Sequence, residues 1–442
     1  MKDSHSSFVK KGIYDYCIIG GGISGLYLAY RILQKDPLCK LILLEKESQF
    51  GGRIMTRSIK GNRGSLIPIP AGAGRFSKEH LRFMALLREF RLIGKIVELS
   101  KVVHYHHIRK VEGGKSQVVI FSEEHMKKLI EKVVRGSHKL SKRVLIDMSF
   151  VELAERFLSK EEVQYIKDSF GYYAELVVMN AFSCLKLMKE LSSKFYALRG
   201  GYMPIIDELV VRIRKLGGIV LNRCFVHSVI SNNDGFMIEY GNKTIYSRKC
   251  IFAIPMNAVM KFPIFNPICP LINICNTNSN PVICAPLCRI YATYPVGIGG
   301  SVWFKGMGRI TTNNNIRMII PISEEDGVIM ISYSDHLFAG WWKSIYDREG
   351  KRGLKREIRS SVSDVVGFQI PDCLAIEIYY WNCGVGYWAV GSDGNRISQA
   401  LVHPITNLGV YICNENIAVD GQQWMEGSLE MADKVMGKLF YT

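Results

Sequence analysis

Three glycines stand at a spacing that suits phosphate binding. Gly20, Gly22 and Gly25 form a G-x-G-x-x-G pattern between an apolar run over 16–19 and a helical pattern that follows it. Glycines at this spacing permit a tight turn and let the backbone approach a pyrophosphate, while the helix N-terminus offers free N–H groups. Glu45 ends the next apolar run, where a carboxylate accepts hydrogen bonds from a ribose diol. The pattern predicts dinucleotide binding rather than a structural glycine turn, and an acid at this position disfavours NADP because it repels a 2′-phosphate.

Two further glycine-rich stretches indicate which dinucleotide is bound. The motif F-G-G-R occupies 50–53, and A-G-A-G-R-F occupies 71–76. Two more close backbone approaches and two arginines suit a long cofactor with a charged pyrophosphate and a ring system. FAD is therefore favoured over NAD, and an ordinary loop with solvated arginines is the alternative.

The order of these motifs resembles the N-terminal region of the flavin-containing amine oxidase family, which includes monoamine oxidases, polyamine oxidases and flavin histone demethylases. The matching motifs are G-G-G-I-S-G-L, L-L-E-K, G-G-R-I-M-T and A-G-A-G-R-F, spread from Tyr14 to Phe76. Later stretches are similar to the family's glycine pair before a helix, at 199–203, and to its final block, at 424–428. The resemblance covers the FAD-binding third of the chain by motif and the remainder by layout.

The resemblance implies a set of residues around FAD. Val226 falls where the family uses a valine backbone to hold adenine, and Glu415 falls where an acid contacts the cofactor. Met425 opens the last helix, whose N-terminus would stabilise negative charge on the reduced ring. The residues expected to contact FAD are Gly20, Gly22, Ile23, Ser24, Gly25, Glu45, Lys46, Gly52, Arg53, Gly72, Ala73, Gly74, Arg75, Val226, Glu415, Met425 and Cys383.

The family's chemistry is transfer of a hydride equivalent from an amine α-carbon to flavin N5, followed by imine hydrolysis and reoxidation, usually by O2. The reaction needs a neutral amine against the ring, and apolar aromatic walls supply this by desolvating the ammonium, which lowers its pKa. Trp424 falls where the family often places one wall. The catalytic candidates are Trp424, Trp381, Tyr387, Trp388 and Arg289, the last at the approximate position of a lysine that holds a water near N5.

Three positions depart from the family pattern, and a fourth, Cys383, matches only part of the family. Gly384 falls where monoamine oxidases carry the second aromatic wall, and Asn414 replaces a glycine. Arg289 keeps a positive charge but cannot give up its proton, so proton transfer through it is not expected; a strand residue paired to a surface acid is its other interpretation. Cys383 aligns with the cysteine that carries covalent flavin, although we favour a buried structural thiol and noncovalent FAD. These changes argue against fast oxidation of simple amines.

The elements that position these residues follow from apolar periodicity. The first strand, helix and strand form a unit of the length that a parallel pair requires, so they begin a doubly wound sheet. The sequence predicts strands at 16–19, 41–44, 218–221, 250–254, 316–320, 328–331, 375–379 and 409–413, and helices at 24–34, about 121–134, around 205–213 and at 425–439.

The expected fold class is α/β, with a Rossmann-like FAD-binding domain from discontinuous segments and an inserted mixed α+β substrate domain. The FAD-binding domain is expected to comprise 1–77, 197–265 and 401–442. The substrate domain is expected to combine a helix-rich part, 78–196, with a β-rich part, 266–400. The cleft between the two domains would hold the chemistry.

The composition of the 442 residues, 48% hydrophobic and 22% charged, is that of a packed globular protein and excludes disorder or a fibrous repeat. Twelve scattered cysteines without a C-x-x-C pair predict free thiols in a reducing compartment. Because no apolar leader or spanning run is found, we expect a soluble cytoplasmic protein. His104, His106 and His107 are expected at an exposed strand edge, and no metal site is predicted.

The net charge of +17 bears on partners. It could attract nucleic acid, an anionic membrane or an acidic ligand, yet no homeodomain, zinc-finger or RNP signature accompanies it, and it repels polycations at long range. Three functions stay open: oxidation of a small amine or amino acid, action of a flavoprotein on a nonamine hydrophobic substrate, and a decayed flavin-binding protein that binds an acidic partner. Loss of the paired aromatic cage would favour the second.

Overall fold

In the computed structural model, the strand that precedes the glycine motif belongs to a seven-stranded sheet, called sheet 1 here. The structure describes residues 12–99, 103–110, 116–190, 194–232, 234–268 and 280–441. The strand order is β10-β2-β1-β13-β12-β11, and β19 also pairs with β13. The pairs of β1, β2, β10, β13 and β19 are parallel, whereas β11 and β12 add antiparallel strands. The bounds are β1 Tyr14–Ile19, β2 Leu41–Leu44, β10 Ile219–Leu221, β11 Val226–Asn232, β12 Gly235–Tyr240, β13 Lys243–Phe252 and β19 Val410–Ile412.

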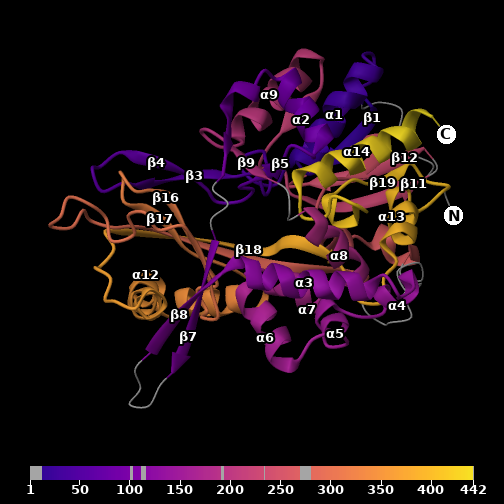
Figure 1. The fold of residues 1–442 in the computed structure, drawn as a ribbon. Coiled ribbons are helices and arrows are strands. Elements are labelled where there is room, and N and C mark those ends of the chain that lie inside the picture. The colour runs from indigo at the N-terminus through magenta and orange to yellow at the C-terminus, as the bar shows by residue number, and fades with distance from the viewer. Residues whose placement is uncertain are drawn as a thin grey trace.

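Four helices gather on sheet 1 (Figure 1). α1 follows β1 and contacts both α9 and α14, and α2 contacts α14. Leu26, Leu28 and Ile32 of α1 are fully buried, so packing of its apolar face stabilises the helix more than propensity does. The bounds are α1 Ile23–Lys35, α2 Leu81–Glu89, α9 Met203–Lys215 and α14 Met425–Phe440.

A second seven-stranded sheet, called sheet 2 here, draws on both expected insertions. Its order is β18-β14-β17-β16-β15-β7-β8, and β15 pairs with β7 in parallel. The helix-rich stretch therefore supplies two strands, of which the first contains the histidines expected on a strand and the second was not predicted. The bounds are β7 Val103–Lys110, β8 Ser116–Ser122, β14 Val282–Thr293, β15 Arg309–Thr312, β16 Met318–Ser323, β17 Val328–Asp335 and β18 Ala375–Trp388.

A long helix, α12 (His336–Val366), packs against sheet 2 and also escaped the sequence analysis. Gly350 kinks it, with φ 62°, and dense charges interrupt its apolar spacing. Its buried side of Trp342, Leu354 and Ile358 joins the core of sheet 2. The stretch 266–400 is thus not purely β-rich, because one stripe of apolar residues suffices to bury a helix whose other faces are charged.

Six helices form a cluster against β14 and β18 (Figure 1), where Ala285 and Tyr387 join their apolar core. The amphipathic helix expected near 121–134 is confirmed as α3, which buries Leu129 and Val133. Ser149 and Glu152 form a capping box at the start of α5, in which the side chain of each accepts a hydrogen bond from the backbone N–H of the other. The bounds are α3 Glu123–Ser137, α4 Lys142–Ile146, α5 Phe150–Ala154, α6 Lys160–Ser169, α7 Tyr173–Val177 and α8 Ala181–Glu190.

Smaller elements link the two sheets. β3 pairs with β4, and β9 lies between β5 and β6. The bounds are β3 Thr56–Lys60, β4 Leu66–Pro70, β5 Phe76–Ser77, β6 Ile96–Glu98, β9 Phe195–Leu198, α10 Met256–Val259, α13 Gly394–Val402 and the 3-10 turns η1 Ile93–Lys95, η2 Pro263–Ile268 and η3 Glu415–Ile417.

The mixed α/β fold class with a Rossmann-like part and a further sheet is confirmed. Three local expectations need correction. The strand expected from 316 begins at Met318, because Arg317 has a positive φ of 58°. The strand expected to reach 254 ends at Phe252. His106 is buried rather than at an exposed edge, and its Nδ1 lies 2.9 Å from the carbonyl oxygen of Val365. Within the described ranges, no helix combines the length and apolar character that crossing a bilayer requires.

Candidate cofactor and active site

The turn between β1 and α1 is shaped by close backbone contacts at two glycines and by open space at a third. Gly20 has φ 111°, and a Cβ there would lie 2.5 Å from the carbonyl oxygen of Ala253. A Cβ on Gly25 would lie 2.1 Å from the carbonyl oxygen of Gly20, so the first turn of α1 can sit on the strand end only without a side chain. At Gly22 the nearest atom to such a Cβ would be 4.0 Å away. That opening is where a ligand can approach the backbone.

Glu45 is buried at the end of β2, with 6% of its surface exposed. Its Oε2 accepts a hydrogen bond from the N–H of Gly21 at 2.6 Å, and its Oε1 accepts from the N–H of Glu47 at 2.8 Å. The carboxylate therefore organises the glycine turn directly, a role that the sequence analysis did not foresee. Since a carboxylate offers about four acceptor positions, a ribose hydroxyl can still bond to it. Lys46 points to the surface and pairs with Glu47 at 3.3 Å.

The segment that carries Val226 lies against the end of β2. The N–H of Cys224 donates to the carbonyl oxygen of Glu45 at 2.7 Å, and the N–H of Arg223 donates to that of Glu47 at 3.0 Å. Val226 itself is buried at the start of β11. The segment just before Val226 therefore contacts the end of β2 at Glu45.

The second and third glycine stretches join the first. The N–H of Gly51 donates to the carbonyl oxygen of Gly21 at 2.8 Å, and a Cβ on Gly52 would lie 3.3 Å from the Cα of Gly22. The N–H of Ala73 donates to the carbonyl oxygen of Arg53 at 2.9 Å. Gly72 packs on the same carbonyl group. Gly20, Gly22, Gly52, Gly72 and Ala73 are therefore brought together.

Arg53 and Glu415 form an ion pair beside these glycines. Arg53 Nη1 donates to Glu415 Oε1 at 2.7 Å, and Nη2 contacts Oε2. Arg53 Nη1 also donates to the carbonyl oxygen of Gly384 at 3.1 Å, which ties β18 to the glycine segments. Burial opposes the charge of Arg53, but Glu415 outweighs it, and the pKa of Arg53 is raised. Asn416 Nδ2 donates to Glu415 Oε1 at 2.7 Å.

These residues fit a dinucleotide with a charged pyrophosphate. α1 begins at Ile23, runs on through Ser24, and has no side-chain cap and no acid in its first turn, so its N-terminal N–H groups are left for a ligand. α14 begins at Met425 with Trp424 before it and likewise has no side-chain cap. Two helix N-termini, a cationic side chain and the open space at Gly22 suit an anionic cofactor.

A group of two arginines and five aromatic residues, called the arginine–aromatic cluster here, lies between the third glycine stretch and sheet 2. The Arg75 guanidinium is 4.3 Å from the ring centroid of Phe195 and 5.4 Å from those of Tyr172 and Trp424. The members are Arg75, Tyr172, Phe195, Tyr202, Arg289, Tyr333 and Trp424. Four of them, Tyr172, Phe195, Tyr202 and Tyr333, were not predicted as site residues; Tyr202 lies in the glycine-pair stretch at 199–203, and no motif marks the other three.

Arg289 lies in this cluster on β14 and is buried, rather than paired to a surface acid. Its guanidinium is 4.6 Å from the ring centroid of Tyr333, and its Nη1 donates to the carbonyl oxygen of Pro70 at 2.8 Å. A Cβ on Gly74 would lie 3.2 Å from the same nitrogen. The structure thus places Arg289 directly beside the stretch that carries Gly74 and Arg75.

The charge of the cluster affects its phenols. Burial raises the pKa of Tyr172, but the guanidiniums of Arg75 and Arg309 lower it by more, so the net shift is downward. Arg309 Nη2 lies 3.4 Å from the Tyr172 hydroxyl. The rings of Tyr172 and Tyr333 meet edge to face with centroids 5.6 Å apart. The cluster is therefore a buried site with excess positive charge.

Trp424 forms an aromatic wall with two neighbours. Its ring stacks on Phe195 with centroids 5.6 Å apart and lies 4.9 Å from the ring of His80. Its Nε1 is buried without a hydrogen-bond partner, and Gln423 before it has a positive φ of 73°. Such strain at a non-glycine residue is characteristic of functional sites.

The other aromatic candidates are placed differently. Trp381 is half-buried, and its Nε1 donates to the carbonyl oxygen of Ala71 at 2.8 Å, beside the third glycine stretch. Tyr387 is buried among the helices that cover β14 and β18. Trp388 lies in the core of sheet 1 and donates from Nε1 to the carbonyl oxygen of Ala418 at 3.0 Å. Neither Tyr387 nor Trp388 belongs to the arginine–aromatic cluster.

Cys383 is bonded to Cys284 in a disulfide between β18 and β14, 99 residues apart in the sequence. The expectation of a free structural thiol is therefore wrong at this position, and the same bond leaves no sulfur for a thioether to flavin. Eight other cysteines of the described residues are free, most of them buried. Cys269 and Cys275 lie outside the described residues.

His80 is expected to make the protein less stable as the pH falls. Its ring is 6% exposed, and burial lowers its pKa from 6.5 to about 4. Because the pKa of His80 is lower in the folded state than in the unfolded state, the stability gained from its neutral ring is present in full above pH 6.5 and is lost as the pH falls toward 4. The loss approaches about 3 kcal/mol, at about 1.4 kcal/mol per pH unit. Urea unfolding at several pH values should show a smaller pH dependence for His80→Gln than for the parent, and equal dependence would contradict the prediction.

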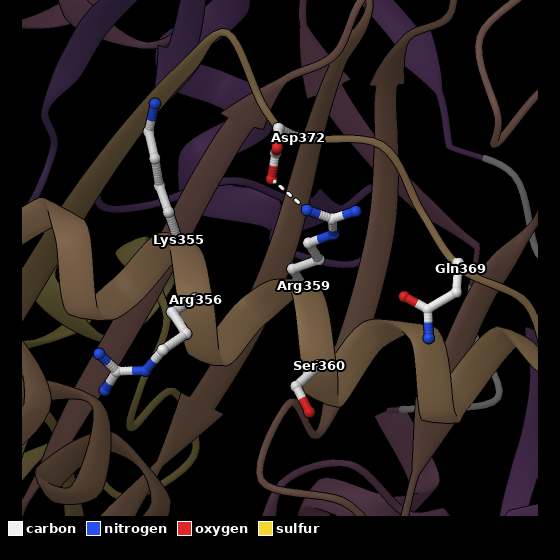
Figure 2. Close-up of a pocket in the computed structure, with 6 residues that line it drawn as sticks. All are labelled: Lys355, Arg356, Arg359, Ser360, Gln369 and Asp372. Carbon is white, nitrogen blue, oxygen red and sulfur yellow. Dashed lines mark hydrogen bonds and ion pairs between the residues drawn. The ribbon is translucent and has the colours of Figure 1, made fainter.

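A hollow of about 440 Å³ lies on α12 and the loop after it, away from the residues above (Figure 2). Its cations are already engaged: Arg359 pairs with Asp372 at 3.0 Å, and Lys355 donates to the carbonyl oxygen of Cys373 at 3.1 Å. Arg356 pairs with Glu349. The three cations of the hollow thus already have partners within the protein, and the candidate site is the one built on the glycine segments.

Comparisons with known proteins agree with the glycine motif. The family described as NAD(P)-binding Rossmann-like domain matches residues 18–90. The uncharacterized protein R188 of Acanthamoeba polyphaga mimivirus is 21% identical over 493 aligned residues, which cover 96% of this chain and 94% of that protein.

Solved structures of putrescine oxidase are similar over nearly the whole chain. A wild-type structure bound to putrescine has a TM-score of 0.69 at 16% identity, covering 98% of this chain and 100% of that chain. A mutant from a structure-based redesign of cofactor binding has a TM-score of 0.72 at 16% identity, covering 96% and 98%. At this identity the likeness shows the fold, and it confirms the fold that the resemblance to flavin amine oxidases implied.

Proposed function

We propose that the protein is an FAD-dependent oxidoreductase that oxidises an amine by transfer of a hydride equivalent to flavin N5, with O2 as the electron acceptor. The observation that carries the proposal is the convergence of three glycine segments, Glu45 and the Arg53–Glu415 pair at the N-terminus of α1. An aromatic wall at the N-terminus of α14 continues the same site. The fold shared with putrescine oxidase supports both the flavin and the class of substrate.

Different residues would hold different parts of the cofactor. The backbone at Gly22 and the N-terminus of α1 would hold the pyrophosphate, with Arg53 supplying positive charge. Glu45 and the backbone near Val226 would hold the adenosine. The N-terminus of α14 at Met425 would face the pyrimidine edge of the ring. Bound FAD supplies the two-electron acceptor for the reaction.

The chain's own side chains prepare the substrate. Trp424 and Phe195 form a stacked wall that excludes water and disfavours a charged ammonium. Arg289 cannot accept a proton, so it holds and orients rather than acting as a base. A side chain at Gly384 would meet Leu287 at 2.5 Å, so Leu287 fills the place of a second aromatic wall. One wall instead of two argues against fast oxidation of simple amines.

The domain boundaries remain part of the proposal. Strands of sheet 1 fall within 1–77, 197–265 and 401–442, and strands of sheet 2 fall within 78–196 and 266–400, which supports the division into a cofactor and a substrate domain. A cytoplasmic location and an acidic partner for the basic surface are likewise proposed from the sequence alone.

Purified protein tests the proposal directly. We expect a yellow protein that releases FAD on denaturation, because the sulfur of Cys383 is bonded to Cys284. Peroxide release with a panel of amines and amino acids should then identify a substrate. Folded protein that is colourless and takes up no added FAD would overturn the proposal. Bound flavin that no panel member reduces, with salt-sensitive retention on a polyanion, would instead favour an interaction protein.

A further inference from the structure

We propose, building on the proposed function, that the amine substrate carries a carboxylate, which Arg75, Arg289 and the hydroxyl of Tyr202 bind within the arginine–aromatic cluster. The substrate would thus be an amino acid rather than a diamine such as putrescine. Uncompensated positive charge and a buried hydroxyl without a partner among the described residues both favour an anionic ligand here.

Neither arginine has a counterion among the described residues. Across the residues that the structure describes, no carboxylate oxygen lies within 4.0 Å of a guanidinium nitrogen of Arg75 or Arg289, whereas twenty-two other cation–acid pairs meet that distance. Arg289 is 8% exposed. A buried charge without a partner is costly, so the site is completed by an anion from outside.

Donor groups remain available for such an anion. A guanidinium carries five N–H donors, of which Arg289 uses one for the carbonyl oxygen of Pro70 and others for the hydroxyls of Tyr333 and Tyr291, so part of the group remains for a ligand. Arg75 contacts aromatic faces of Phe195, Tyr172 and Trp424, which leave the N–H edge of its planar group for a ligand. Planar forks of this kind bind a carboxylate through two parallel hydrogen bonds.

Tyr202 provides the second, independent observation. Its side chain is 2% exposed, and within the described part of the chain its hydroxyl has no partner at hydrogen-bond geometry, although the backbone of Leu198 lies close enough to lower its pKa. Its ring meets that of Phe76, which follows Arg75 in the chain, with centroids 6.3 Å apart. Burial raises the pKa of the hydroxyl, and the positive charges of Arg289 and Arg75 oppose this shift. An unpaired buried hydroxyl costs about 1–3 kcal/mol, which a carboxylate oxygen would offset.

The nearby acids do not reverse the sign of the site. Asp335 accepts hydrogen bonds from the N–H groups of Tyr173 and Ala174 at 3.1 and 2.9 Å, so it serves the start of α7. Glu175 is buried on the same helix and acts on Tyr172, where it is outweighed by Arg75 and Arg309. The net positive charge of the arginine–aromatic cluster attracts an anion and repels the second ammonium of a diamine.

Benzoate and benzylamine test the inference, because they share a ring and differ in charge. We expect FAD-loaded protein to bind benzoate, with a saturable change in flavin absorbance that salt weakens, and to bind benzylamine at least tenfold less tightly. Arg289→Met should weaken benzoate binding at least tenfold while keeping the flavin content of the parent, and Arg289→Lys should recover part of it. Arg75→Met should weaken benzoate binding to a similar extent. Arg352→Met, on the exposed face of α12, serves as the matched control.

Two outcomes overturn the inference. The first is a parent protein that prefers benzylamine to benzoate. The second is loss of FAD itself from Arg75→Met and Arg289→Met, which would show that the anion is a phosphate of the cofactor. Titration of apoprotein with benzoate by calorimetry separates this inference from the proposed function. A parent that binds benzoate through both arginines but takes up no FAD would remove the proposed function and leave the anion site in place.

Discussion

Replacing Gly25 with alanine is expected to abolish retention of FAD and to destabilise the protein by about 3 kcal/mol. The new Cβ would lie 2.1 Å from the carbonyl oxygen of Gly20 and 3.1 Å from the Cβ of Ala253. Both contacts involve the backbone or its first side-chain atom, so neither can rotate away. α1 must therefore shift off the end of β1, and its N-terminal N–H groups no longer point at the pyrophosphate. Flavin content per polypeptide and urea unfolding measure the two effects.

Gly22 and Gly94 provide controls that separate folding from binding. Gly22 has φ −73°, and a Cβ there would meet no atom nearer than 4.0 Å, so Gly22→Ala should change stability by less than about 1 kcal/mol. The same methyl group would occupy the path of the pyrophosphate and should weaken FAD binding at least tenfold. Gly94→Ala, on η1 with open space around it, should change neither. Full flavin content in Gly25→Ala would show that the pyrophosphate lies elsewhere.

The part of the site that the sequence could predict is the part that is local in the chain. Gly20, Gly25 and Glu45 belong to one strand–helix–strand unit, where each residue type is dictated by its immediate neighbours. Periodicity within such a unit fixes which atoms meet, and the strands and helix over 14–44 were found with small errors at their ends. Motif spacing therefore carried structural information without knowledge of the remaining fold.

The arginine–aromatic cluster could not be predicted, because its members come from separate elements. Tyr172 precedes α7, Phe195 begins β9, and Tyr333 lies on β17. Only the pairing of β14 with β17 and the packing of helices on sheet 2 bring them to Arg289. The Cys284–Cys383 bond follows from the same kind of long-range pairing, between β14 and β18. Neither the cluster nor the disulfide produces a regular spacing of residues in the sequence, so motif spacing could not predict either of them.

Arg289 illustrates how the fold changes the interpretation of one residue. In the sequence, Arg289 falls at the approximate position of a lysine in the family pattern, and pairing with a surface acid was an equal alternative. The structure buries it next to Gly74 and Arg75, with aromatic rings instead of carboxylates around it. A guanidinium in these surroundings is placed to hold an anion, whereas one paired to a surface acid would not be.

Replacing Arg53 with methionine is expected to destabilise the protein without cofactor by about 3 kcal/mol and to prevent FAD binding. The loss leaves the Glu415 carboxylate, whose side chain is 4% exposed, with a hydrogen bond from the amide of Asn416 at 2.7 Å in place of the ion pair. A buried carboxylate without its cation carries most of its desolvation cost unrelieved. The value falls at the lower end for buried pairs because the Arg53 side chain is 28% exposed. Urea unfolding of the apoprotein measures it.

The double variant Arg53→Met/Glu415→Gln distinguishes a broken ion pair from lost packing. Removing both charges should recover at least half of the stability lost in Arg53→Met, because no buried charge is left without a partner. FAD binding should stay absent, since the positive charge beside the pyrophosphate is gone. The exposed pair of Arg63 and Glu325, also 2.7 Å apart, gives the reference: Arg63→Met should cost less than about 1 kcal/mol. Additive effects of the two changes on the free energy of unfolding would show that the two charges are not coupled. Arg53 would then hold β18 only through its hydrogen bond to the carbonyl oxygen of Gly384.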